Sequence, residues 1–367
     1  MNDKIRLSAI ILSAGYSSRM GNLKPLLKFE NKYALELLVE TYINSKIDDI
    51  VIVVGYRAAD IMDRLKHLKV KWVVNSKYDE GMYSSIKVGL NHLDQASTGF
   101  FINPVDVPII KISTIERLKR EFVKAQKGII YPLFSAEKGH PPIISIKYKQ
   151  KIIENTLPGG LKHLLELYDQ DSVQVSVCDN GSLMDMDTPS DYKLLDEYFK
   201  SRKIPNDEEC KAIWKCNNLP LNIIRHCEKV SNIACSICNS LLLKGSLIDI
   251  KKLKAAALLH DIGRLQNNHA KAGQEILKAL GYDEIGNIIL VHMDIDIGEN
   301  IEITEAEILY LADKLVIGDK RVTLEERFEK SIKKYEDNLQ IYSKILHREK
   351  NAKIISDKIS KITGDNF

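Results

Sequence analysis

One stretch of the sequence decides the fold of the first half of the chain: Ala9-Ile-Ile-Leu-Ser-Ala-Gly-Tyr-Ser-Ser-Arg-Met-Gly21. It starts as an apolar run and passes directly into a glycine and serine loop, which is typical of a buried β-strand that ends at a ligand-binding turn. Gly15 lets backbone amides approach a ligand, and Arg19 and Lys24 add positive charge. These features predict a triphosphate site. The loop is neither a Walker A motif nor a dinucleotide fingerprint, because it lacks Gly-Lys-Ser/Thr and Gly-x-Gly-x-x-Gly.

Outward from this loop, short β-branched runs alternate with helical patterns over residues 1–200. The predicted strands are residues 9–13, 50–54, 71–74, 99–104, 128–132, 143–146 and 173–177. The predicted helices are residues 34–44, 60–67, 84–93 and 114–126. The alternation predicts a three-layer, Rossmann-like α/β domain with an open, mostly parallel sheet, helices on both faces and right-handed crossovers.

The pattern becomes purely helical after Pro205. Helices are predicted at residues 223–243, 250–260, 269–280, 284–292, 304–318 and from 324 onward. The polar stretch 201–209 is the predicted linker. We therefore expect an α/β domain over residues 1–200, an all-α domain over 206–340 and a helical tail over 341–367, whose residues 351–367 form a last amphipathic helix.

The composition excludes several classes of protein. The 367 residues carry 53 Lys and Arg against 50 Asp and Glu, a net charge of +3, which is no basic footprint for nucleic acid or an anionic membrane. No apolar run approaches the roughly 18 residues that cross a bilayer. The run in residues 1–14 is too short for a signal peptide and is predicted to be the first strand.

Six cysteines form no disulfide framework in a chain of this length, so a reducing cytoplasm is expected. Cys235 and Cys238 are predicted to be small apolar residues on a helix.

Five segments resemble one family. The first, Leu12-Ser-Ala-Gly-x-Ser-Ser-Arg-Met-Gly-x-x-Lys24, is similar to the signature of nucleotidyltransferases with a glycosyltransferase-A-like fold, and most similar to the molybdenum cofactor cytidylyltransferase (MobA-like) branch. The other segments are Asn75-Ser-Lys-Tyr-Asp-Glu-Gly-Met-Tyr-Ser-Ser-Ile-Lys-Val-Gly-Leu90, Pro104-Val-Asp106-Val-Pro108, Gly139-His140-Pro141-Pro142 and Asp185-Met-Asp187-Thr-Pro189-Ser-Asp191-Tyr192. The resemblance spans nearly all of residues 5–195.

The chemistry of nucleotidyl transfer fits the charged residues. Expulsion of pyrophosphate builds charge on phosphoryl oxygens, so it needs cations and in-line positioning more than a protein nucleophile. Asp106 follows a strand, where ligands bind in open α/β sheets. Mg²⁺ takes one or two carboxylates, and Asp106 and Asp187 are the expected pair, with Asp185 as the substitute. Arg19 and Lys24 would neutralise the triphosphate.

The resemblance implies further binding residues. It places the nucleotide against Leu12, Ala14, Gly15, Gly81, Ser84 and Ser85. It also places His140 on the acceptor side, although a loop histidine before two prolines has a purely structural explanation as well.

Histidines and aspartates form a second constellation, in the helical half. His260-Asp261 closes an apolar helix, and its two side chains cannot share a helix face. A metal between them must lie near the helix end, where other helices supply His226 and Asp313. His269 and His292 could hold a second ion. Mixed imidazole and carboxylate ligands suit divalent Fe or Mn.

The order His…His-Asp…His…His…Asp over residues 222–320 resembles the HD phosphohydrolase superfamily, including its compact dinuclear members that cleave dinucleoside polyphosphates. The resemblance implies metal-dependent hydrolysis of a phosphate ester or phosphoanhydride, with Asp261 among the catalytic residues. Two bridged ions would generate hydroxide and clamp a phosphate. Lys314, Arg264, Lys320 and Arg321 are available to bind phosphate, although solvation at the surface is the commoner use of such residues.

The two resemblances together predict a bifunctional enzyme. The first domain transfers a nucleotidyl group, CMP from CTP in preference to GMP from GTP, to molybdopterin or the molybdenum cofactor, and the second is a metal-dependent phosphohydrolase. This predicted function is compatible with a molybdoenzyme or a chaperone as a protein partner. The alternative is a sugar-phosphate or choline-phosphate nucleotidyltransferase with an HD module that senses nucleotides without turnover.

Overall fold

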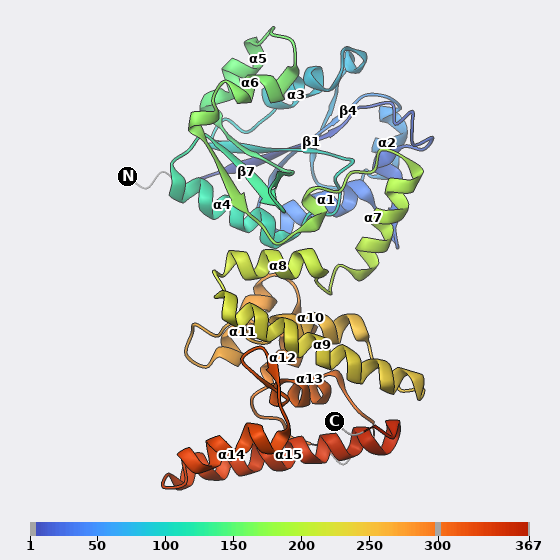
Figure 1. Cartoon of the computed structure of the whole chain (residues 1–367). Coiled ribbons are helices and arrows are strands. Elements are labelled where there is room, and N and C mark those ends of the chain that lie inside the picture. The colour runs from blue at the N-terminus through green and yellow to red at the C-terminus, as the bar shows by residue number, and fades with distance from the viewer. Residues whose placement is uncertain (1–4, 298–301, 366–367) are drawn as a thin grey trace. The chain divides into compact units, whose positions relative to one another are not determined.

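The computed structural model describes residues 5–297 and 302–365, and the chain divides into two compact units, Met1–Arg202 and Lys203–Phe367 (Figure 1). Each unit is described by itself. No helix among the described residues is both long enough and apolar enough to span a bilayer.

The first unit alternates strands and helices, as predicted. Its strands are β1 (Leu7–Ser13), β2 (Lys28–Phe29), β3 (Lys32–Tyr33), β4 (Asp49–Val54), β5 (Lys71–Val74), β6 (Gly99–Pro104), β7 (Ile129–Phe134), β8 (Glu137–Lys138), β9 (Ile143–Ser145) and β10 (Ser172–Ser176). Its α-helices are α1 (Ala34–Asn44), α2 (Ala58–Arg64), α3 (Met82–Asn91), α4 (Ile112–Ala125), α5 (Lys149–Glu154), α6 (Gly160–Glu166) and α7 (Pro189–Ser201).

The main sheet of the described residues has the order β10-β7-β9-β6-β1-β4-β5, with β8 paired to β7. β1 pairs in parallel with both β4 and β6, and β4–β5 and β10–β7 are also parallel. The short β9 runs antiparallel between β6 and β7. The predicted open, mostly parallel sheet is therefore confirmed, and β1, which carries the loop, lies inside it with strands on both sides.

Both faces of the sheet are buried. Along β1, Ala9 and Ile11 enter one core cluster with α1, α2 and α4, while Ile10 and Leu12 enter a second one with α3, α5 and α6. Successive side chains of a strand point to opposite faces, so a continuous apolar strand needs helices on both sides. The three predicted layers are present.

The second unit is helical. Its elements are α8 (Asp207–Cys216), α9 (Leu221–Leu243), α10 (Ile250–Leu259), α11 (His269–Ala279), α12 (Asp283–Leu290), α13 (Glu305–Lys314), β11 (Val316–Ile317), β12 (Lys320–Arg321), α14 (Leu324–Lys334) and α15 (Leu339–Thr363). α9 packs against α10 and α13, and α15 packs against α13 and α14.

Three expectations for this half are wrong in detail. The predicted linker 201–209 contains the start of α8, because Asn206 and Glu209 form a capping box and Trp214 donates to the carbonyl of Leu258 at 2.8 Å. The predicted helix 304–318 ends at Lys314, and the β11–β12 hairpin follows, with Gly318 at positive φ. The last helix begins at Leu339, well before residue 351.

Candidate active sites

The first site lies at the carboxyl ends of β1 and β6. The loop after β1 and the stretch 78–85 line a cavity of about 320 Å³ that also contains Lys24 and Asp106. A backbone hydrogen bond holds the loop 185–187 beside Asp106, because the amide of Met186 donates to the carbonyl of Asp106 at 2.9 Å. Ligands bind at the carboxyl ends of strands in such sheets, so the cavity has the expected position for a substrate.

Lys24 joins the two carboxylates that the sequence singled out. Its Nζ lies 3.2 Å from Asp106 Oδ2 and 2.6 Å from Asp187 Oδ1. Arg19 Nη2 contacts the other oxygen of Asp187 at 3.1 Å. The ammonium therefore offsets the repulsion between two carboxylates that the fold brings together from β6 and from the loop before α7.

The electrostatics of the carboxylates differ. The hydrogen bond from Lys24 holds the pKa of Asp187 below its usual value, although partial burial opposes this. Desolvation, followed by repulsion from Asp187 and Asp106, raises the pKa of Asp185. Asp187 is therefore ionised more readily than Asp185. Hard carboxylate oxygens of this kind suit Mg²⁺.

The predicted nucleotide-binding residues divide into two groups. Leu12, Ala14, Gly15, Gly81 and Ser85 line the cavity. Ser84 instead stabilises the turn before α3, because its hydroxyl accepts from Asn75 Nδ2 at 2.8 Å and donates to the carbonyl of Gly81 at 2.8 Å.

His140 lies on an exposed loop within electrostatic range of Asp106. Its backbone N–H donates to the carbonyl of Ser182 at 2.8 Å. Its assignment to the acceptor side stays a prediction.

The sequence reasoning missed an aromatic group in this cavity. Tyr16 and Tyr78 line it, and their ring centroids lie 5.3 Å apart, with Tyr56 also 5.1 Å from Tyr16. Tyrosines from three separate segments give no local pattern in the sequence.

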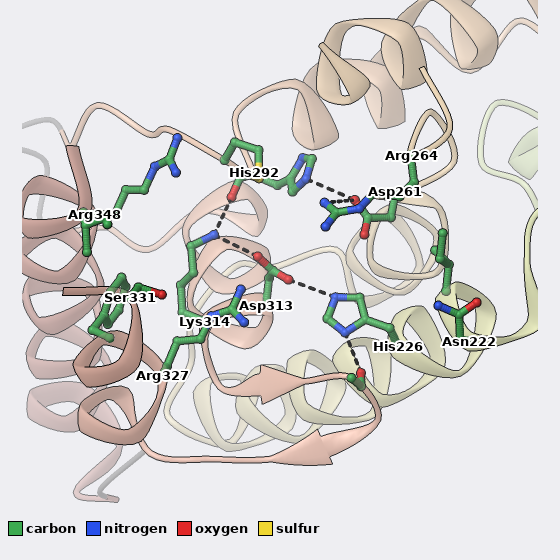
Figure 2. A pocket seen from close by; sticks show the side chains of 15 residues that line it. Asn222, His226, Asp261, Arg264, His292, Asp313, Lys314, Arg327, Ser331 and Arg348 are labelled. Atoms are coloured by element: carbon green, nitrogen blue, oxygen red, sulfur yellow. Dashed lines mark hydrogen bonds and ion pairs between the residues drawn. The ribbon is translucent and has the colours of Figure 1, made fainter. Parts of the chain in front are cut away.

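The second site lies where α9, α10, α11 and α13 meet, and Figure 2 shows several of its side chains around one pocket. Two groups of side chains have ligand atoms within 4.8 Å of one another. The first group is His226, His260 and Asp261, and the second is Asp261, His269 and His292. Asp261 belongs to both groups, so its carboxylate could contribute to holding an ion in either of them.

Asp313 completes the first group. Its Oδ1 lies 3.1 Å from His226 Nε2 and 3.6 Å from His260 Nε2. In the second group, Asp261 Oδ1 lies 3.4 Å from His269 Nε2 and 3.6 Å from His292 Nε2. The six residues that the sequence singled out in this half, His226, His260, Asp261, His269, His292 and Asp313, are therefore brought together.

Backbone carbonyls orient three of the imidazoles. The Nδ1 atoms of His226, His260 and His292 lie 2.8, 2.8 and 2.6 Å from the carbonyl oxygens of Gly318, Ala257 and Ile289. A donating Nδ1–H leaves a lone pair on Nε2, and each Nε2 points toward the carboxylates, which is the usual arrangement of metal-ligating histidines.

Two buried atoms of the cluster lack a hydrogen-bond partner among the described residues: His260 Nε2 and Asp261 Oδ1. Leaving buried polar atoms unsatisfied costs about 1–3 kcal/mol each. Here they face a site that a cation would satisfy, so the donor set fits divalent metal ions.

Burial and charge act in opposite directions within the cluster. Burial would raise the pKa of Asp261, but the nearby imidazole of His292 and the charges of His260 and Arg264 hold it below its usual range. Burial lowers the pKa of His292 and of His269. At His260 contacts with Cys227 and Asp313 outweigh burial and raise the pKa.

The interpretation of Lys314 as a solvated surface residue is wrong. Only 4% of it is exposed, and its Nζ donates to Asp313 Oδ2 at 2.8 Å and to the carbonyl of His292 at 2.9 Å. It therefore connects Asp313 of the first ligand group with the backbone of His292 in the second group. Arg264 lies 3.6 Å from Asp261 at the pocket, whereas Lys320 and Arg321 are exposed on β12.

Cys235 and Cys238 belong to neither ligand group. Cys235 and Cys238 lie on α9, and burial raises the pKa of Cys238 to about 11. They are small residues on a helix, as predicted.

Two families match this chain. The MobA-like NTP transferase domain matches residues 9–174, and the HD domain matches residues 223–317. The molybdenum cofactor cytidylyltransferase of Escherichia coli is 25% identical over 194 residues, which cover 53% of this chain and 97% of that protein. A probable molybdenum cofactor guanylyltransferase of Natranaerobius thermophilus is 28% identical over 218 residues, which cover 54% of this chain and 98% of that protein. An uncharacterized protein of Methanocaldococcus jannaschii is 34% identical over 135 residues, which cover 32% and 78% of the two chains.

The two matched regions contain the loop after β1 and the histidine and aspartate cluster, respectively. Domains of both kinds generally depend on divalent metals, and transferases of this type take an NTP and a phosphorylated acceptor. The chain is therefore an enzyme with two domains, a MobA-like NTP transferase domain at residues 9–174 and an HD domain at residues 223–317.

Proposed function

We propose that the first unit transfers CMP from CTP to a phosphorylated acceptor such as molybdopterin or its molybdenum-bound form, and that the second unit hydrolyses a phosphate ester or phosphoanhydride. The observation that carries the first part is the convergence of Asp106 and Asp187 on Lys24. The similarity to a cytidylyltransferase favours CTP, and the similarity to a guanylyltransferase makes GTP the nucleotide to compare.

In the transfer step, an oxygen of the acceptor phosphate attacks the α-phosphorus, the bond to the β-phosphate oxygen breaks and pyrophosphate leaves. Lys24 and Arg19 offset the negative charge that develops on the phosphoryl oxygens. The amides around Gly15 hold the phosphates without a side chain in the way. Asp106 and Asp187 would hold Mg²⁺, which supplies further positive charge at the triphosphate when bound.

In the second unit, the group of His226, His260, Asp261 and Asp313 would hold one ion, and the group of Asp261, His269 and His292 a second one. Such ions polarise a phosphoryl group and lower the pKa of water. Arg264 lines the pocket, where its guanidinium would bind a phosphate oxygen. Lys314 fixes Asp313 and compensates its charge, so its role is to position a ligand residue.

The transfer is tested by exchange of labelled pyrophosphate into CTP and GTP by the purified full-length chain with Mg²⁺ and molybdopterin. The acceptor must be present, because direct attack forms no nucleotidyl-enzyme and pyrophosphate can return only to the nucleotidyl adduct. CTP is expected to support the faster exchange, and molybdopterin to yield a nucleotidyl adduct in mass spectrometry. Sugar phosphates and phosphocholine are the comparison acceptors. The transferase assignment fails if no nucleotide supports exchange while phosphate release from esters continues.

The hydrolase is tested by phosphate release from p-nitrophenyl phosphate and from a nucleoside diphosphate with added Mn²⁺ or Fe²⁺. His260→Ala should abolish this release and lower the bound metal. Retained metal and undiminished hydrolysis in His260→Ala would remove the site assignment.

A further inference from the structure

The wall of the second unit's pocket opposite the histidines comes from outside the matched HD region. The HD match ends at residue 317, but α14 and α15 contribute Arg327, Phe328, Ser331, Ile345 and Arg348 to the pocket lining. The same cavity of about 430 Å³ contains His226, Asp261, His292 and Asp313. In Figure 2, Arg327, Ser331 and Arg348 lie across the pocket from His226 and Asp261.

The start of α14 fixes which side chains face this pocket. Thr323 and Glu326 form a capping box, with the amide of Glu326 donating to Thr323 Oγ1 at 3.2 Å and the amide of Thr323 to Glu326 Oε2 at 2.9 Å. Leu324 and Phe328 are buried and anchor the helix. Arg327 and Ser331 are four residues apart and share the pocket face, whereas Lys330 is exposed.

The cations around this pocket differ in their partners. Arg348 makes a bidentate pair with Asp294 at 2.6 and 2.8 Å, Lys314 is paired with Asp313, and Arg264 lies near Asp261. Arg327 is half-buried, and its guanidinium has no carboxylate partner within the described parts of the chain. An uncompensated guanidinium in the same cavity as the proposed metal ligands favours an anionic ligand.

Resting on the proposed hydrolase, we infer that Arg327 and Ser331 bind a second phosphoryl group of the ligand, next to the one taken by the histidine and aspartate cluster. The planar guanidinium offers paired donors that match phosphate oxygens, and the Ser331 hydroxyl offers one more. The ligand class is then a molecule with at least two phosphoryl groups. Arg327 selects it and takes no part in bond cleavage.

The binding test uses methylenediphosphonate, which carries two phosphoryl groups and no hydrolysable bridge, and inorganic phosphate as the single-group probe. Hydrogen exchange is followed in peptides covering residues 324–334 of the full-length chain with Mn²⁺. Methylenediphosphonate should protect these peptides in the native chain and, more weakly, in Arg327→Lys, which keeps the charge but not the paired donors. Arg327→Gln should lose the protection, and Lys330→Gln, which removes a charge from the exposed face of the same helix, should keep it.

The matching kinetic readout is inhibition of p-nitrophenyl phosphate hydrolysis. Arg327→Gln should raise the inhibition constant of methylenediphosphonate about 10-fold or more, since hydrogen bonds to charged groups are worth about 1.5–3 kcal/mol, and leave that of inorganic phosphate within about twofold. Equal losses for both probes, or unchanged protection in Arg327→Gln, would overturn the inference. Protection as expected without any hydrolysis would refute the proposed hydrolase and leave the second phosphoryl position standing.

Discussion

The two sites hold their carboxylates in different ways. In the first unit, Asp106 and Asp187 are partly exposed and are held by the side-chain cations Lys24 and Arg19. In the second unit, Asp261 and Asp313 are buried among imidazoles that backbone carbonyls orient. In the proposed function, the first site would exchange its internal ion pairs for a triphosphate and a metal, whereas the second is preorganised around fixed donors. The comparison predicts that single substitutions are more severe in the second site.

The largest effect is expected for Asp261→Asn. Its carboxylate is shared by both ligand groups, so the substitution should reduce phosphate release by at least about 100-fold while pyrophosphate exchange with CTP stays unchanged. Initial rates of both reactions on one preparation check this. Asp337→Asn, at an exposed position, is the control. Equal loss of both activities would mean that the two sites are not independent.

A smaller effect is expected for Lys24→Gln. Removing the ammonium leaves Asp106 and Asp187 facing each other and removes a cation from the triphosphate, so pyrophosphate exchange should fall about 100-fold. Arg19→Gln should cost less, because that side chain is 73% exposed and contacts Asp187 alone among these carboxylates. A variant order in which Arg19→Gln is the more damaging would contradict the central place given to Lys24.

Gly263→Ala should disturb only the ligand group of the second site that contains His269. A Cβ at Gly263 would lie 2.6 Å from the amide nitrogen of Gly273 and would also clash with the carbonyl of His269, so α11 must shift and take His269 with it. Affinity for the second ion should fall about 10- to 100-fold, as in His269→Gln, with the first ion retained. Metal titration followed by calorimetry measures both steps, and loss of the first ion alone would refute this placement.

Asp49→Asn tests what a held carboxylate contributes to stability at a position that has no role at either site. Asp49 is buried at the start of β4 and is held by Ser8 Oγ, the amide of Asp94 and Lys71 Nζ. Burial would raise its pKa, but these hydrogen bonds bring it below the usual value. We expect a loss of about 1–3 kcal/mol in the free energy of unfolding of the first unit.

The sign of the pH dependence follows from the lowered pKa of Asp49. The stabilisation is fully present above about pH 4, where the unfolded carboxyl is ionised, and is lost as the pH falls through the folded-state pKa. Denaturant unfolding at pH 7 and at pH 3 checks this. The loss in Asp49→Asn should shrink at pH 3, while the exposed neighbour Asp48→Asn stays neutral at both.

Local sequence patterns predicted much of the molecule. The apolar run of β1, its glycine loop and the helical periodicity after Pro205 are determined by nearby residues, and the order of histidines and aspartates indicated the cluster on α9 to α13. Contacts between distant segments could not be predicted in this way. The antiparallel β9, the tyrosines around Tyr16 and the burial of Lys314 all depend on tertiary packing.

The most direct test of the account is elemental analysis of the dialysed full-length chain and two variants. The shared position of Asp261 predicts two tightly held divalent ions per chain, loss of both in Asp261→Asn and retention of one in His269→Gln. A native chain without bound metal after loading with Mn²⁺ or Fe²⁺, or an Asp261→Asn variant that keeps both ions, would contradict it.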